Sequence, residues 1–159
     1  MAKTALQFRH NGREVAVFVD GGVNLLTMLR EVIGDMTPKF GCGQGGCGAC
    51  TVLIDGDAHL SCLTLAEMVE GRSVETLDSL KTGPKLHPLQ AAFMEHFAAQ
   101  CGYCTPGMLM AAKALLDRNP SPTRAEVVEA ISGNICRCTG YEPIINAVLA
   151  AASGGRARA

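Results

Sequence analysis

The sequence predicts an α+β half followed by an all-α half. Short apolar runs separated by tight turns occupy the first half, and beyond residue 86 apolar residues recur with a period of about 3.6 residues. Between the two, Lys81–Lys85 combines glycine, proline and lysine in the manner of a linker. We therefore expect one domain over residues 1–77, a linker over residues 78–86 and a helical domain over residues 87–159.

A β-hairpin is expected at the start of the chain, where Ala5–Arg9 and Glu14–Val19 flank the turn dipeptide Asn11-Gly12. A helix is expected over Asn24–Ile33, because its apolar residues, Val32 among them, share one face. The other elements expected in this half are a strand, a tight turn, a short helix and a closing strand, in the order Thr51–Ile54, Asp55-Gly56, Leu63–Val69 and Ser73–Leu77.

Four helices are expected in the second half: Pro88–Gln100, Pro106–Arg118, a helix that begins with a capping box and ends at Gly133, and Pro143–Ala152. The first has His96 and Phe97 on its apolar face. Thr105 is expected to cap the second helix, and the Thr123–Glu126 box the third. The tail Ser153–Ala159 is expected to fray.

The composition argues against several classes of function. Lys and Arg number 14 against 15 Asp and Glu, so the net charge of −1 leaves no basic surface for nucleic acid. Aromatic residues make up 4%, too few for a base-stacking platform. No apolar run reaches the length of about 18 residues that a membrane span needs, and Met1–Asp20 lacks the features of a signal peptide. We therefore expect a cytoplasmic protein.

The 8 cysteines fall into two groups of four. In a reducing cytoplasm, clustered cysteines bind metal or take part in redox chemistry. The first group has the spacing C-x4-C-x2-C with a more distant fourth cysteine, which is the plant-type [2Fe–2S] pattern. Its members are Cys42, Cys47, Cys50 and Cys62. The glycines around them can turn backbone N–H groups toward the sulfurs of a cluster.

The second group lies in two connections between predicted helices. Cys101 and Cys104 fall between the first and second helices, and Cys136 and Cys138 fall between the third and fourth. Two helix pairs packed side by side would bring these four sulfurs together with approximate two-fold symmetry. Structural zinc is the main alternative, since four-cysteine zinc sites also use C-x2-C. Disulfides do not suit the expected compartment.

Three segments around these cysteines resemble the iron–sulfur subunit of the xanthine oxidase family of molybdenum hydroxylases: Gly46–Val52, Gln100–Gly107 and Gly133–Tyr141. The resemblance covers about residues 4–150 and is nearest to separately encoded small subunits, such as those of aerobic carbon monoxide dehydrogenase and 4-hydroxybenzoyl-CoA reductase. One departure precedes the first cysteine loop, where relatives often carry a glycine and this chain has Met36–Lys39.

The resemblance implies a plant-ferredoxin-like β-grasp domain followed by a four-helix bundle with two-fold pseudosymmetry, each carrying one [2Fe–2S] cluster. The clusters would relay electrons between a molybdenum-pterin, often the cytosine dinucleotide, on a large partner subunit and FAD on a medium one. The assembly implied is a dimer of heterotrimers. The cluster of the second cysteine group would lie near the pterin and that of the first near the flavin. Gln100 and Cys138 match positions that approach the pterin in relatives.

The chain offers no acid–base pair and no nucleophile at a plausible substrate site, so we expect no catalytic residue on it. Arg137, between two cysteines, is either a tuning residue for a cluster's potential or a surface residue. The four histidines share no ligand spacing and are expected to be structural or exposed. Three other functions stay open: a flavin-free two-subunit enzyme that reduces a cytochrome, a stand-alone ferredoxin shuttle and a zinc-stabilised interaction module.

Overall fold

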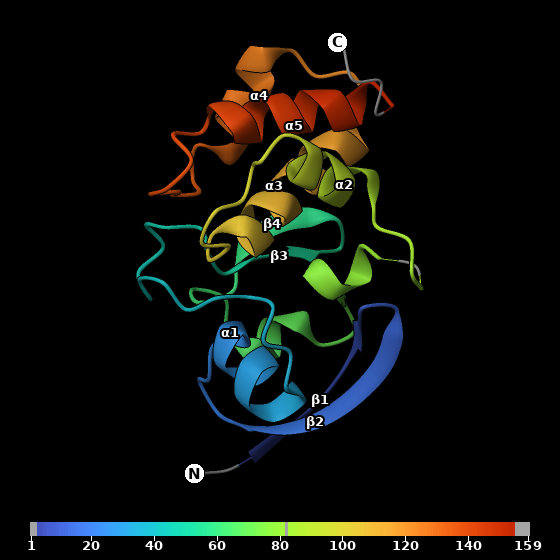
Figure 1. Cartoon of the computed structure of the whole chain (residues 1–159). Helices are drawn as coiled ribbons and strands as arrows, with labels where there is room; N and C mark the ends of the chain where they lie inside the picture. Colours follow the sequence, from blue (N-terminus) through green and yellow to red (C-terminus); the bar gives the residue numbers. More distant parts are fainter. Residues whose placement is uncertain (1–2, 82, 155–159) are drawn as a thin grey trace.

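The structure, a computed structural model, describes residues 3–81 and 83–154. In Figure 1, β1, β2 and α1 form the lower part of the molecule, α2–α5 form the upper part, and β3 and β4 lie between them. The strands are β1 (Lys3–His10), β2 (Arg13–Asp20), β3 (Thr51–Ile54), β4 (Asp57–Leu60) and β5 (Ser73–Glu75). The α-helices are α1 (Leu25–Thr27), α2 (Pro88–Glu95), α3 (Thr105–Arg118), α4 (Arg124–Ile131) and α5 (Glu142–Ala152). A π-helical segment (Met28–Ile33) and two 3₁₀-helices (Ala66–Val69 and Leu77–Ser79) complete the described elements.

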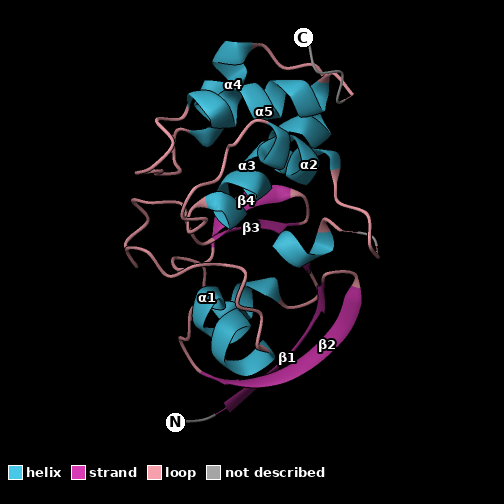
Figure 2. Cartoon of the chain, in the orientation of Figure 1, coloured by secondary structure: helices cyan, strands magenta, loops and turns pink. Residues whose placement is uncertain are grey.

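The strands form one mixed sheet in the order β2-β1-β5-β3-β4. β1 pairs in parallel with β5, and the other neighbouring strands pair antiparallel. The predicted hairpin is confirmed, with Asn11 and Gly12 turning at φ values of 49° and 79°. The predicted tight turn at Asp55-Gly56 joins β3 to β4. β1 and β2 curve around α1, as Figure 2 shows.

The helix predicted over Asn24–Ile33 forms, but its second part is wider than an α-helix. The Asn24 side chain caps it by accepting a backbone hydrogen bond at 2.8 Å, and Gly34 ends it with a φ of 84°. From Met28 to Ile33 the backbone is π-helical, which places more residues in each turn. The change of phase rotates Val32 away from the predicted apolar face, and this residue is 48% exposed.

Two apolar cores support the molecule. The lower core lies between the sheet and the first helix and includes Phe8, Leu25, Met28, Leu29, Val52, Ile54 and Val74. The upper core lies among α2–α5 and includes Leu89, Phe93, Met108, Leu109, Ile131, Ile144 and Val148. Leu53 of β3 and Leu80 also belong to the upper core. The sheet therefore packs directly against the helices, and a linker over residues 78–86 stays a prediction.

Two predictions about the helices are wrong. α2 ends at Glu95 and does not reach Gln100, because Phe97 takes a left-handed conformation with φ of 53°. This conformation turns the Phe97 side chain outward, so it is 81% exposed instead of packed. Thr105 is the first residue of α3 and not its cap. Cys104 occupies the cap position, and the Thr105 hydroxyl is buried without a hydrogen-bond partner.

Other elements form with shifted ends. The Thr123–Glu126 capping box opens α4 as predicted, and α4 ends at Ile131, before Gly133. The short helix expected over Leu63–Val69 is a 3₁₀-helix confined to its last four residues. The predicted tail begins after α5, and its residues 155–159 lie outside the described part of the chain. No helix in the described ranges has the length and apolar character needed to cross a membrane.

The sheet and the helical part meet at a close contact between two glycines. A Cβ atom added to Gly107, in the first turn of α3, would lie 2.2 Å from the carbonyl oxygen of Gly48. That oxygen accepts hydrogen bonds from the Asn134 amide at 2.9 Å and from the Thr51 hydroxyl at 2.7 Å. The contact therefore joins the first cysteine loop to both cysteine-bearing connections of the helical part.

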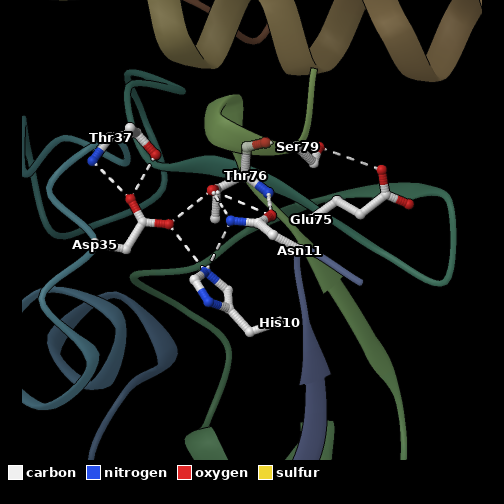
Figure 3. Close-up of polar contacts among 7 residues, drawn as sticks. All are labelled: His10, Asn11, Asp35, Thr37, Glu75, Thr76 and Ser79. Atoms are coloured by element: carbon white, nitrogen blue, oxygen red, sulfur yellow. Dashed lines mark hydrogen bonds and ion pairs between the residues drawn. The ribbon is translucent and has the colours of Figure 1, made fainter. Parts of the chain in front are cut away.

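A buried polar cluster ties the hairpin to the segment that leads into the first cysteine loop (Figure 3). Asp35 is 7% exposed and accepts hydrogen bonds from the hydroxyls of Thr76 at 2.6 Å and Thr37 at 2.7 Å. His10 Nε2 lies 3.0 Å from the Asp35 carboxylate, and the Asn11 amide donates to the Thr76 hydroxyl at 2.9 Å. Burial raises the pKa of Asp35, but the hydrogen bonds from His10, Thr37 and Thr76 outweigh it and hold this pKa well below its ordinary value.

Replacement of Asp35 with asparagine should destabilise the fold by about 1.5–3 kcal/mol, the range for a hydrogen bond to a charged group. The folded pKa of Asp35 lies below the unfolded value of about 3.9. The contribution of Asp35 to the free energy of unfolding is therefore complete above the unfolded pKa. It is lost as the pH falls toward the folded pKa. The cost of Asp35→Asn, measured by urea unfolding, should therefore shrink as the pH falls below about 4.

Asp55→Asn is the matched control, because the Asp55 side chain is 47% exposed beside Arg72. Exposed ion pairs of this kind contribute less than about 1 kcal/mol. An Asp35→Asn cost no larger than that of Asp55→Asn would show that the buried cluster does not hold the hairpin in place. A cost that did not shrink below about pH 4 would contradict the pH dependence derived from Asp35.

Replacement of Gly107 with alanine should destabilise the contact between the two parts. The added methyl group would meet the backbone of Gly48, and overpacking of this kind costs about 1–3 kcal/mol. For a chain of this size, each kcal/mol lowers the melting temperature by about 2–4 °C. Gly133→Ala is the control, because a Cβ atom there has no neighbour within 4 Å. Equal melting temperatures for the two variants would contradict the steric role of Gly107.

Candidate metal centres

The first cysteine group lies in the loop that precedes β3 and in the turn that follows β4. Its thiols stand in two pairs, with Cys47 beside Cys42 and Cys62 beside Cys50. The first pair is half-buried, whereas the second is buried and packs against Leu26. The four cysteines whose spacing predicts one site thus form two pairs, one half-buried and one buried.

The glycine-rich loop directs backbone N–H groups toward Cys42. Hydrogen bonds from the N–H of Gln44, from the Cys47 thiol, and from the N–H groups of Gly46 and Cys47 lower the pKa of the Cys42 thiol to about 7. Gly43, within this loop, has a left-handed φ of 68°, a conformation that costs glycine little. The loop backbone therefore stabilises negative charge on this sulfur.

The buried pair has the opposite electrostatic character. Burial and the neighbouring Cys62 thiol together raise the pKa of Cys50 to about 11, even though the N–H of Cys62 donates to this sulfur. The Ser61 hydroxyl donates to the Cys50 carbonyl at 2.7 Å, so this backbone is held in place. A bound metal cation ionises such a thiol directly, since coordination deprotonates it.

The second cysteine group lies where the sequence predicted, in the α2–α3 and α4–α5 connections. The sulfurs of Cys101 and Cys138 are 3.5 Å apart, and both residues are exposed. Cys104 pairs with the buried Cys136, and burial together with the Cys136 side chain raises the pKa of Cys104 to about 12. As in the first group, one pair is therefore more exposed than the other.

Cys136 accepts hydrogen bonds from the residues that follow it. The Thr139 hydroxyl lies 3.1 Å from Cys136 Sγ, and the N–H groups of Thr139 and Cys138 also donate to this sulfur. Burial raises the pKa of Cys136, but these hydrogen bonds outweigh it and lower the pKa. The Cys136 N–H donates to the Tyr141 hydroxyl at 2.9 Å, which holds the connection against the start of α5.

A backbone hydrogen bond joins the two cysteine groups. The Ile135 N–H, next to Cys136, donates to the carbonyl of Cys47 at 2.9 Å. On the outer side, the Tyr103 hydroxyl donates to the carbonyl of Phe40 at 2.6 Å. No role was predicted for Asn134 or Ile135. Their signal in the sequence is their place in the Gly133–Tyr141 segment, two residues and one residue before Cys136.

The other residues singled out from the sequence lie near these groups or elsewhere in the fold. Gln100 is exposed and directly precedes Cys101. Arg137 is exposed, and within the described residues its side chain makes no hydrogen bond or ion pair. His10 joins the Asp35 cluster, and His87 caps α2 by accepting the Leu89 N–H at 3.2 Å, so both are structural. In residues 3–81 and 83–154, no three His, Cys, Asp or Glu side chains gather closely enough to hold one metal ion.

Comparison with known proteins gives consistent relatives for both halves. Residues 8–76 match the model of the 2Fe-2S iron-sulfur cluster binding domain, and residues 74–149 match that of the [2Fe-2S] binding domain. The chain is 54% identical to the nicotine 6-hydroxylase small subunit of Paenarthrobacter nicotinovorans, over 87% of this chain and 84% of that one. It is 45% identical to the nicotinate dehydrogenase small FeS subunit of Eubacterium barkeri, over 93% and 94% of the two chains.

The fold is also that of a solved relative. A chain of quinoline 2-oxidoreductase from Pseudomonas putida 86 superposes with a TM-score of 0.93 at 48% identity, covering 97% of this chain and 96% of that chain. Sequence and structure thus agree over nearly the whole length. The chain belongs to the iron–sulfur small-subunit family of the xanthine oxidase type of molybdenum hydroxylases.

Proposed function

We propose that each cysteine group holds one [2Fe–2S] cluster. A cluster of this kind takes two cysteine thiolates on each of its two irons, and the thiols of both groups stand in pairs. The proposed ligands are Cys42, Cys47, Cys50 and Cys62 for the first cluster and Cys101, Cys104, Cys136 and Cys138 for the second. A single zinc ion needs four ligands around one atom, so the pairing favours a cluster over zinc.

The polar groups around the thiols also suit a bound [2Fe–2S] cluster. Backbone N–H groups converge on Cys42, where they would meet the negative charge of a cluster. The Thr105 hydroxyl, directly after Cys104, is buried without a partner. Buried hydroxyls in folded proteins are hydrogen-bonded in the large majority of cases. A cluster sulfur beside Cys104 would supply the acceptor that this hydroxyl lacks.

The single observation that carries an electron-relay function is the direct contact between the two groups. The clusters, when bound, supply one-electron redox chemistry. The chain holds their ligands in fixed relation through the Ile135–Cys47 hydrogen bond and the Gly48–Gly107 contact. The protein's role is thus to position two redox centres next to each other and to set the electrostatics around each.

We further propose that the partners are a large subunit with a molybdenum-pterin and a medium subunit with FAD, in a dimer of heterotrimers. The nicotine and nicotinate relatives are both small subunits of larger enzymes, which supports larger partners here. Cys101, Cys138 and Gln100 are exposed together, so the pterin would approach this face. The half-buried Cys42–Cys47 pair would face the flavin. No catalytic residue is needed on this chain, which we place in the cytoplasm.

The purified protein should contain about four irons per chain and give two distinct EPR signals after reduction with dithionite. Cys47→Ser should remove the signal of the first cluster, because that change deletes one of its ligands. Cys136→Ser should remove the signal of the second. Low-temperature EPR and iron analysis, done on anaerobically purified protein, measure both effects.

Each cysteine variant is the control for the other, since the cluster it leaves intact reports correct folding. Loss of both signals in both variants would contradict two separate sites. Colourless wild-type protein with about two zinc ions per chain would replace electron transfer with a structural metal role. Flavin that copurifies with the complex would support the FAD-containing assembly over one that reduces a cytochrome.

A further inference from the structure

The Thr139 hydroxyl occupies a defined position between a cysteine sulfur and a backbone donor. Its oxygen lies 3.1 Å from Cys136 Sγ and accepts a hydrogen bond from the Tyr141 N–H at 3.2 Å. Tyr141 in turn accepts the Cys136 N–H through its own hydroxyl at 2.9 Å. These three contacts close a ring of hydrogen bonds within one short connection, so the orientation of the Thr139 side chain is set by the backbone around it.

The direction of the Thr139–Cys136 hydrogen bond follows from the available protons. A cysteine that binds iron is a thiolate and has no proton to give. The N–H of Tyr141 already donates to the Thr139 oxygen, which leaves the hydroxyl proton free. With a cluster bound, Thr139 therefore donates to the Cys136 sulfur.

Burial makes this hydrogen bond matter for the redox chemistry. Cys136 is only 7% exposed, so water competes little for its sulfur and the local dielectric is low. One-electron reduction adds negative charge to the cluster and its thiolates. A hydrogen bond to a thiolate sulfur stabilises the reduced form more than the oxidised form, and hydrogen bonds to the sulfurs are one of the factors that set the potential.

We infer that Thr139 is a tuning residue that raises the reduction potential of the second cluster by donating its hydroxyl proton to Cys136 Sγ. This inference rests on the proposed function, in which Cys136 is a cluster ligand. It differs from the role considered for Arg137, since the Arg137 side chain makes no hydrogen bond or ion pair within the described residues whereas Thr139 touches the sulfur. The two N–H donors to Cys136 come from the backbone and persist in any side-chain variant.

Thr139→Val keeps the branched shape and deletes the hydroxyl. We expect it to make the second cluster about tenfold harder to reduce relative to the first, a fall in midpoint potential of about 59 mV for one electron. Thr139→Ser, which keeps the hydroxyl, should stay close to wild type. An EPR-monitored redox titration of the whole purified protein follows both signals in one sample, so the first cluster is an internal reference.

Ser132→Ala is the matched control, because Ser132 is exposed in the same connection and its hydroxyl donates to the Glu129 carbonyl and not to a sulfur. Thr139→Ala gives a second test that adds no methyl group beside the sulfur. An unchanged midpoint potential of the second cluster in iron-replete Thr139→Val or Thr139→Ala protein would overturn the inference. A shift in Thr139→Ser as large as the shift in Thr139→Val would also overturn it. Wild-type protein without a second EPR signal would instead overturn the proposed function, and this inference with it.

Discussion

The close approach of Gly48 and Gly107 is the constraint on which the arrangement of both cysteine groups depends. Gly48 directly follows Cys47, and Gly107 lies in the helical turn that begins after Cys104. Because neither residue has a side chain, the two backbones meet and the Asn134 amide can reach the Gly48 carbonyl. The direct Ile135–Cys47 hydrogen bond forms beside this contact. Any larger residue at the contact would push the two cysteine groups apart.

Charge would impose the second constraint, since eight thiolates and the two proposed clusters would bring negative charge into a small protein. The chain has donors that would offset this charge locally, with N–H groups around Cys42 in the first group and with Thr139 and backbone donors around Cys136 in the second. In residues 3–81 and 83–154, no lysine or arginine side chain donates a hydrogen bond to either of these two sulfurs. Fixed backbone dipoles stabilise added charge without the entropy cost of ordering a long side chain. The preference for backbone donors also explains why so many glycines surround the first group.

The sequence predicted the elements that depend on local patterns and missed those that depend on distant contacts. The Asn11-Gly12 hairpin and the Thr123 capping box are local, and both form as predicted. The left-handed turn at Phe97, by contrast, ends α2 early in a segment whose apolar period continued through it. The cysteine spacing predicted two groups of four thiols. Their internal pairing and the role of Asn134 needed the fold, because Gly48 and Asn134 are 86 residues apart.

In both groups one thiol pair is more exposed than the other, and this difference suits a relay. An electron-transfer protein must let partner cofactors approach each redox centre and must also keep water from most of it. The exposed Cys101–Cys138 pair leaves one side of the second site open, while Cys104 and Cys136 face the protein. The Ile135–Cys47 hydrogen bond starts from the residue next to the protected Cys136 and ends on the half-buried pair of the first group. In the proposed relay this hydrogen bond would connect the surroundings of the two clusters, and the hydrogen bond from Thr139 would act on the adjacent sulfur of Cys136.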